Sequence, residues 1–357
     1  MKDNQLQSVF EGITTYTAQQ MKLLATLTKP NYVDALKDVR AKLGEVYGRY
    51  GDSGTLNYAE MMQYNKLGTL LNAVDSGIQD NLDISDHVNR ILSDTAATSY
   101  TRAIDTAPID LPKLSNADIT ELLGKVRLNT ATIEERLSLM QRDTSLRVQT
   151  QIKQDLLRGS PLEDTYRNVG KVFDKVYLRD MKGLDDIHHK VAQNAVQRAL
   201  KTGQDAGLIP TKTWVTCGDE KVRPAHASLD GQTVDANDLF TVGQDSGEST
   251  EWDGYQASVP LDFNEPALDY NCRCWIVADW REEDEETTST FAPEEEGLSE
   301  EMVNEMADNG QSEEDIAAYE DQAQDSYDEF SDIEGDPADQ QYQGWQVFLD
   351  MEDQEEE

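Results

Sequence analysis

Residues 212–234, KTWVTCGDEKVRPAHASLDGQTV, and residues 271–275, NCRCW, decide the fold of the second half of this chain. Short runs of aromatic and β-branched residues at 212–216 and 275–277 predict strands, and the pair Asp230-Gly231 predicts a turn. Four of the five tryptophans and all three cysteines lie within residues 211–280. We expect a small, loop-rich α+β module here. A module of about 70 residues usually needs a metal or a host domain for stability.

The region before this module is predicted to be helical, because apolar residues recur three and four positions apart. Pro30 is expected to close a first helix, and Gly159 to end a later one before Ser160-Pro161 opens the next. The adjacent His188 and His189 are interpreted as part of a solvated helix face, since neighbouring helical residues point about 100° apart. The other expected helical segments are residues 33–51, 58–73, 86–104, 132–159 and 184–203.

The charge is concentrated in the last part of the sequence. The 357 residues carry a net charge of −39, and residues 281–357 hold 30 of the 70 acidic side chains but only one basic residue, Arg281. This composition is typical of a disordered acidic tail. The apolar residues Trp345, Val347, Phe348 and Leu349 within it are a candidate docking motif for a basic surface of a partner.

The same charge excludes several classes of protein. Binding to nucleic acid depends on Lys and Arg that neutralise phosphates, so neither sequence-specific DNA binding nor docking on anionic membranes is expected. No run approaches the roughly 18 apolar residues of a membrane span. The polar start, MKDNQ, lacks an apolar signal region. We therefore expect a protein made in the cytoplasm of a cell.

Three residues from two separated segments are candidate metal ligands. His226, Cys272 and Cys274 are borderline or soft ligands, and Cys217 is a possible fourth. Four such ligands suit a closed tetrahedral site for one structural Zn²⁺. Two alternatives stay open, because the cysteines of a Cys-x-Cys pair at a strand end share one face. They would then pack in the core as reduced thiols, or form a redox-labile pair.

An enzyme is the less favoured interpretation. His226, Asp230 and a cysteine resemble parts of a Cys/His nucleophilic site. The sequence nevertheless contains no phosphate loop, no Gly-rich dinucleotide turn and no His-Glu-x-x-His motif. We therefore assign no catalytic and no cofactor-binding residues.

The two motifs together resemble the Mu F-like minor head protein family of tailed phages. The pattern W-x4-D-x3-RP-x-H-x2-LDG followed by NCRC covers residues 214–274, and the resemblance is best over about 180–280. One departure is that the Arg-Thr-Glu triplet of many members is absent from the preceding helix. The matching residues are Trp214, Asp219, Arg223, Pro224, His226, Leu229, Asp230, Gly231, Pro260, Asn271, Cys272, Arg273 and Cys274.

The resemblance implies a structural protein of the virion head, located inside the head or at the portal vertex. Its partners would be the portal and other head proteins, and its role procapsid assembly and DNA packaging or ejection. The alternatives are a zinc- or Cys/His-dependent hydrolase or toxin-like effector delivered with the DNA, and a scaffold-like internal head protein. The motif residues other than the ligands are expected to hold the fold, with Arg223 and Asp230 as an ion pair.

The sequence thus predicts four parts of an α+β protein. Residues 1–130 form a helical region, and residues 131–210 form the helical part of the head-morphogenesis domain. Residues 211–280 form the loop-rich α+β module with its Cys and His residues. Residues 281–357 form the acidic disordered tail.

Overall fold

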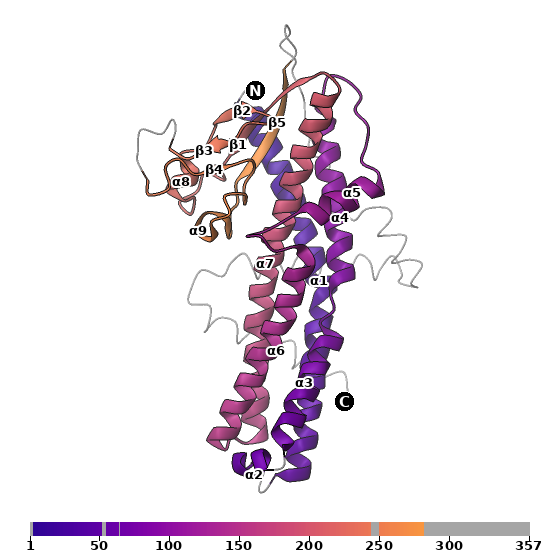
Figure 1. Ribbon diagram of the computed structural model, residues 1–357, viewed down its shortest axis with the longest axis vertical. Coiled ribbons are helices and arrows are strands. Elements are labelled where there is room, and N and C mark those ends of the chain that lie inside the picture. The colour runs from indigo at the N-terminus through magenta and orange to yellow at the C-terminus, as the bar shows by residue number, and fades with distance from the viewer. Residues whose placement is uncertain (1–2, 52–54, 64, 244–249, 282–357) are drawn as a thin grey trace. The chain divides into compact units, whose positions relative to one another are not determined.

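A computed structural model describes residues 3–51, 55–63, 65–243 and 250–281, which form two compact units (Figure 1). Within the described residues, the first unit comprises 3–21, 88–135, 182–243 and 250–281. The second comprises 22–51, 55–63, 65–87 and 136–181. The expected acidic tail lies outside the described residues. The helical first half and the strand-containing module agree with the predicted fold class.

The second unit is helical. It contains α2 (Tyr58–Gln63) and α3 (Lys66–Asn81), together with parts of α1 (Asp3–Tyr50), α4 (Ser85–Ile104), α6 (Ile133–Arg158) and α7 (Leu162–Asp205). Apolar residues at helical spacing form its core. Among the fully or almost fully buried ones are Leu36, Val39, Leu43, Val74, Ile78, Val148, Ile152, Val169 and Phe173. A buried hydrogen bond of 2.9 Å from the Tyr32 hydroxyl to Asp180 joins α1 to α7.

The prediction that Pro30 ends a helix is wrong. The helix α1 continues through Pro30 to Tyr50. A proline inside a helix removes one backbone hydrogen bond and costs about 3 kcal/mol. Leu24 and Tyr32, on either side of Pro30, are buried in the second unit. Burial of one continuous apolar face offsets this local cost, since helices in proteins depend mainly on such packing.

The first unit contains a three-stranded antiparallel sheet (Figure 1). The strand β1 (Ile209–Val215) lies between β2 (Thr233–Asp235) and β5 (Trp275–Arg281), with Thr213 opposite Val277. These strands confirm the two predicted runs. A second, two-stranded sheet pairs β3 (Phe240–Thr241) with β4 (Gln256–Ala257). The short helices α8 (Pro224–Ala227) and α9 (Pro266–Asp269) lie in the connections, and α5 (Asn116–Lys125) precedes the sheet in sequence.

The central strand is buried along most of its length, and Trp214 is its largest core residue. The Trp214 ring contacts His226 at 5.8 Å and Phe240 at 5.2 Å between ring centroids, both edge to face. Phe263 also lies against this ring, at 6.0 Å. Because His226 belongs to this aromatic core, the candidate ligands lie in the interior of the module.

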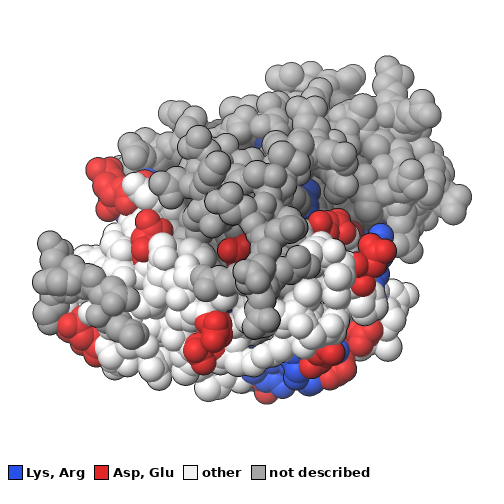
Figure 2. All heavy atoms as spheres, turned by 90° about the horizontal axis from the view of Figure 1, so that it is seen from above, with Lys and Arg blue, Asp and Glu red and all other residues white. Residues whose placement is uncertain are grey.

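None of the described helices is both long enough and apolar enough to span a membrane. On the face seen in Figure 2, acidic side chains form separate patches among uncharged surface, and basic side chains gather at fewer places. The described surface therefore carries charge of both signs.

Candidate metal centre

His226, Cys272 and Cys274 form a buried cluster. The Nδ1 atom of His226 lies 3.3 Å from the Sγ atom of Cys274 and 3.4 Å from that of Cys272. All three ligand atoms lie within 4.8 Å of one another. The three residues are at most 3% exposed. The structure therefore brings together three of the four candidate ligands, with His226 46 and 48 residues before the two cysteines in the sequence.

These distances suit a zinc ion. Zn–N bonds of about 2.05 Å and Zn–S bonds of about 2.3 Å at tetrahedral angles separate nitrogen from sulfur by about 3.5 Å. The two observed N···S distances are 3.3 and 3.4 Å. Two thiolates and an imidazole are also a ligand set that zinc prefers. Three protein ligands thus leave one coordination position for a fourth group.

Local structure explains the position of each ligand. Pro224 occupies the first turn of α8, where its missing N–H has no cost, and this turn places His226 in the core. Cys272 and Cys274 come just before β5, and the backbone of Asn271 is left-handed with φ 54°. That turn brings the chain from α9 into the register of the sheet. Both thiols consequently lie on the His226 side of the sheet.

Polar side chains on α7 hold both ends of the segment that carries Cys272 and Cys274. Asp186 accepts a hydrogen bond of 2.9 Å from the backbone N–H of Asn271. Gln193 accepts one of 2.9 Å from the N–H of Ile276. Because the two contacts lie one residue before Cys272 and two residues after Cys274, they hold the backbone that carries the thiols. This role cannot be predicted from the sequence, because polar residues on a helix are most often solvent-exposed.

The same face of α7 binds the rest of the module through residues 190 and 197. Lys190 donates to the carbonyl of Leu261 at 2.9 Å and to Asp262 at 2.7 Å. Gln197 donates to the carbonyl of Ala236 at 2.6 Å. Residues 186, 190, 193 and 197 are spaced by three or four, so they form one stripe along the helix. The helix α7 is therefore the host element of the small module.

The interpretation of His188 and His189 as a solvated face is wrong. They are 0% and 5% exposed. His188 hydrogen-bonds through Nε2 to the Thr95 hydroxyl at 2.7 Å, and His189 stacks on Trp275 with centroids 4.2 Å apart. Burial lowers the pKa of both imidazoles, that of His188 to about 3. These neutral rings are core residues of the helix.

The two thiols are electrostatically unequal. Burial raises the pKa of Cys272, but hydrogen bonds to Cys274 and His226 together outweigh it and hold that pKa well below its ordinary value. The hydrogen bond to Cys272, together with burial, raises the pKa of Cys274. The two thiols therefore differ in how easily they ionise. A bound metal would take both as thiolates, because cysteine binds metals in its deprotonated form.

Cys217 lies apart from this cluster. It is half-buried and is not part of the three-residue group. Burial raises the pKa of its thiol. Asp219, two residues on, forms a bidentate ion pair with Arg273, at 2.7 and 2.8 Å. This ion pair ties the loop after β1 to the residue between the two buried cysteines.

The remaining motif residues stabilise loops. Arg223 and Asp230 bind backbone groups rather than each other: Arg223 donates to the carbonyl of Tyr270, and Asp230 accepts 2.7 Å from the N–H of Thr216. Gly231 adopts a φ of 76°, which L side chains rarely adopt, and its N–H donates to the Trp214 carbonyl at 2.8 Å. The motif thus closes the loop between β1 and β2.

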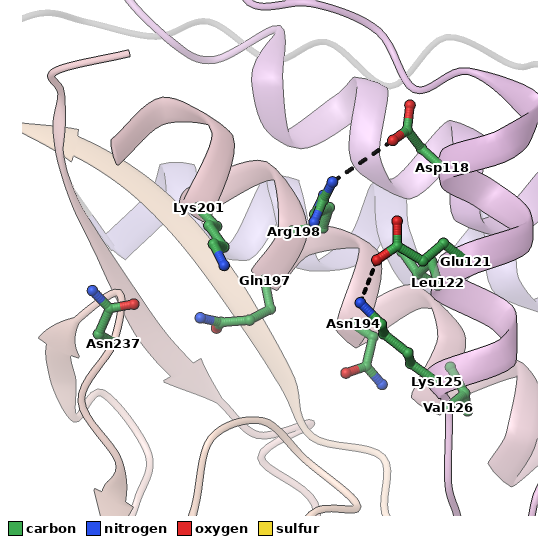
Figure 3. Close-up of a pocket in the computed structure, with 10 residues that line it drawn as sticks. All are labelled: Asp118, Glu121, Leu122, Lys125, Val126, Asn194, Gln197, Arg198, Lys201 and Asn237. Carbon is green, nitrogen blue, oxygen red and sulfur yellow. Dashed lines mark hydrogen bonds and ion pairs between the residues drawn. The ribbon is translucent and has the colours of Figure 1, made fainter. Parts of the chain in front are cut away.

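A pocket of about 210 Å³ lies elsewhere in the first unit, between α5, α7 and the loop at Asn237 (Figure 3). Arg198 lies 3.7 Å from Asp118, and Lys125 pairs with Glu121. Four of its charged side chains are therefore paired within the pocket itself. It contains none of the candidate metal ligands.

One family model and two known proteins are similar to parts of this chain. Residues 146–277 match the family model described as Phage Mu protein F like protein. The minor head protein GP7 of Bacillus phage SPP1 is 19% identical over 252 residues, which are 69% of this chain and 79% of that protein. The NAD(+)–arginine ADP-ribosyltransferase EFV of Enterococcus faecalis is 20% identical over 256 residues. These aligned residues cover 69% of this chain and 49% of the transferase. No solved structure matches.

The family match begins in α6 and ends in β5, so it contains α7, the sheet and all three clustered ligands. It includes the residues on which the sequence resemblance rests. The resemblance is therefore confirmed over residues 146–277, which are similar to the family described as Phage Mu protein F like protein.

Proposed function

We propose that this chain is a minor head protein of a tailed phage, acts in head morphogenesis and resides in the virion. The observation that carries the proposal is the family match over residues 146–277, which spans the helical host and the Cys/His module together. The similarity to GP7 supports it, because the aligned region covers 79% of that minor head protein.

The protein acts through contacts with other proteins. Its partners are the portal and neighbouring head proteins, and its contribution is to procapsid assembly and to DNA packaging or ejection. Long helices such as α1 and α7, with 48 and 44 residues, provide extended contact surfaces of the kind that assembly requires. The small module, which is held along residues 186–197 of α7, adds a second surface.

The metal centre gives this module its stability. His226, Cys272 and Cys274 would hold one Zn²⁺ as a structural ion. Binding free energy at such a site is folding free energy, because the ligands are not assembled in the unfolded chain. The donor set and the N···S distances support zinc.

The proposal is tested in a phage whose copy of this chain is interrupted by a stop codon. We expect few DNA-filled heads by electron microscopy, restored when the chain is supplied in trans. Mass spectrometry should then find the protein in purified virions, and an affinity-tagged portal should retain it from lysates. Normal filled heads without the protein would refute the proposal. Presence in procapsids but absence from mature virions would favour a scaffold-like internal protein instead.

The alternative function is enzymatic, and the observation that favours it is the similarity to the transferase EFV. The variant His226→Gln separates the two functions. If the centre is structural, the variant loses metal and thermal stability together. A variant that keeps its fold but loses a hydrolase or transferase activity of the wild type would favour the enzyme.

A further inference from the structure

A structural zinc ion is normally held by four protein ligands, and the cluster in the first unit supplies three of them. His226, Cys272 and Cys274 are all buried, so bulk water has little access to the remaining coordination position. The fourth ligand would be a nitrogen, a sulfur or a carboxylate oxygen that is buried beside the cluster and is not already used in another bond.

Two buried side chains near the cluster do not meet this requirement. His189 stacks on Trp275 with centroids 4.2 Å apart, and its ring hydrogen-bonds to backbone groups of Cys272 and Cys274. The Nε2 atom of His189 has no partner, so these bonds come from Nδ1 and Nε2 points away from those backbone groups. The indole nitrogen of Trp214 carries a proton and can only donate.

Asp269, the last residue of α9, has an unused ligand atom. Its side chain is 0% exposed. Backbone N–H groups of Phe263 and Glu265 stabilise the carboxylate, and Oδ1 accepts from Phe263 at 3.0 Å. The second oxygen, Oδ2, is buried and forms no hydrogen bond of normal geometry with any described residue. A buried acceptor without a partner is costly, and a bound ion is one of the ordinary explanations for it.

Local structure keeps Asp269 close to the cluster. The backbone N–H of Cys272 donates to the carbonyl of Asp269 at 3.3 Å, which closes a turn between α9 and the first of the two buried cysteines. Phe263, whose N–H binds the Asp269 carboxylate, also places its ring 5.7 Å from the ring of His226. Asp269 is therefore tied to both of the segments that supply the three clustered ligands.

A nearby cation suits an additional anionic ligand. Zn²⁺ with two thiolates and one carboxylate carries one net negative charge, and a buried charge needs compensation. Lys190 is 2% exposed and acts electrostatically on both Asp269 and Cys272. Its ammonium also pairs with Asp262 at 2.7 Å, and the Asp262 side chain is 39% exposed. Lys190 therefore offsets part of the negative charge of the site from within the core.

We propose that Oδ2 of Asp269 is the fourth zinc ligand and closes a tetrahedral site with His226, Cys272 and Cys274. Asp269 is not part of the group whose ligand atoms lie within 4.8 Å of one another. Ligation therefore requires its side chain to rotate inward, while Oδ1 keeps the N–H of Phe263. The inference rests on the zinc centre proposed above and deepens it, because a closed site holds no exchangeable water for hydrolysis.

Cobalt(II) substitution of the full-length protein tests the fourth ligand, because the absorption spectrum of cobalt reports its coordination. Thiocyanate binds only at an open position, so it should leave the wild-type spectrum unchanged. The variant Asp269→Asn keeps an oxygen for the N–H of Phe263, but it should respond to thiocyanate and bind zinc at least about tenfold more weakly. The matched control Asp262→Asn removes a carboxylate paired with Lys190 and should behave as the wild type does.

Three results would overturn the inference and leave the zinc centre in place. The first is a wild-type spectrum that changes with thiocyanate, which would indicate bound water, and the second is unchanged zinc affinity in Asp269→Asn. X-ray absorption of zinc-loaded wild type should show two sulfur and two nitrogen or oxygen neighbours. A third sulfur neighbour, which would identify Cys217, is the third result. Wild-type protein that binds no zinc would overturn both the inference and the proposed zinc centre.

Discussion

At the residue scale, the cluster of His226, Cys272 and Cys274 gives the most direct prediction. Protein purified without chelator should contain about one zinc per chain. The variant Cys272→Ser should lose the metal and melt at a lower temperature, since it removes a ligand from a buried site. The variant Cys217→Ser should keep both, because Cys217 lies outside the cluster. Elemental analysis measures the zinc content, and calorimetry measures the melting temperature.

The opposite result is equally informative. Wild-type protein that is metal-free and fully folded would exclude a structural zinc ion. The two buried thiols would then be core residues, held by hydrogen bonds to His226. Metal loss in Cys217→Ser would instead make that residue the fourth ligand.

His188 should make the protein sensitive to acid. Its pKa is lowered to about 3 in the folded state against 6.5 in the unfolded chain, so the unfolded state binds more protons between these values. Its contribution is fully present above pH 6.5 and is lost as the pH falls toward 3. In denaturant titrations, the stability difference between wild type and His188→Gln should shrink by about 2 kcal/mol between pH 7 and pH 5. A difference that is constant with pH would contradict a neutral buried imidazole.

The roles of individual residues could be predicted from the sequence where those residues belong to a motif. The three clustered ligands can be predicted because borderline or soft side chains recur in two segments, but the sequence does not determine whether Cys217 joins them. His188 and His189 were misplaced because their helix has a second buried face. Polar residues on that face, such as Gln193, bind backbone of the module rather than water. A single sequence does not distinguish such a face from a solvated one.

At the scale of elements, the α7 stripe predicts a measurable coupling between helix and module. Gln193→Leu should destabilise the protein by about 1–3 kcal/mol, because it leaves the buried N–H of Ile276 without its acceptor. It should also weaken zinc affinity, since Ile276 directly follows the segment that carries the cysteines. The control Gln154→Leu makes the same change at an exposed position of α6. Equal effects of the two variants in urea titrations would rule out this coupling.

The continuous helix α1 predicts the effect of removing its proline. Pro30→Ala should raise the free energy of unfolding, by up to about 3 kcal/mol, because it restores a helical hydrogen bond and relieves a clash. If α1 ended at Pro30, the substitution would be close to neutral or would destabilise a turn. Thermal unfolding followed by circular dichroism distinguishes the two cases.

The elements with a strong local signal were the predictable ones. The strands β1 and β5 and the helix α4 follow from aromatic and apolar patterning. Pro30 was misjudged because tertiary burial outweighs a local penalty. The expected single helix over 58–73 is two helices, α2 and α3, with Asn65 between them in a left-handed conformation of φ 52°. The helix α5 was missed because none of its residues is fully buried, which weakens its apolar pattern.

At the scale of the whole molecule, contacts divide the described chain into two units that interleave in sequence. Such interleaving follows from long helices, because α1 and α7 each contribute residues to both units. Apolar periodicity reports that a helix exists but not which partner buries its face. The predicted boundaries near residues 130 and 210 therefore remain predictions about folding domains. Expressing residues 131–281 alone and measuring cooperative unfolding would test them.

The distribution of charge predicts what truncation does. Deleting residues 282–357 removes 30 acidic side chains and no basic ones, and therefore takes the net charge from −39 to −9. The β5 strand and its pairing with β1 end at Arg281, so the sheet and the metal cluster are retained. The truncated protein should keep its zinc and its melting temperature but enter phage heads less efficiently, measured by quantitative mass spectrometry of purified particles. Normal incorporation and infectivity would mean that assembly needs the helices and the module but not the acidic segment.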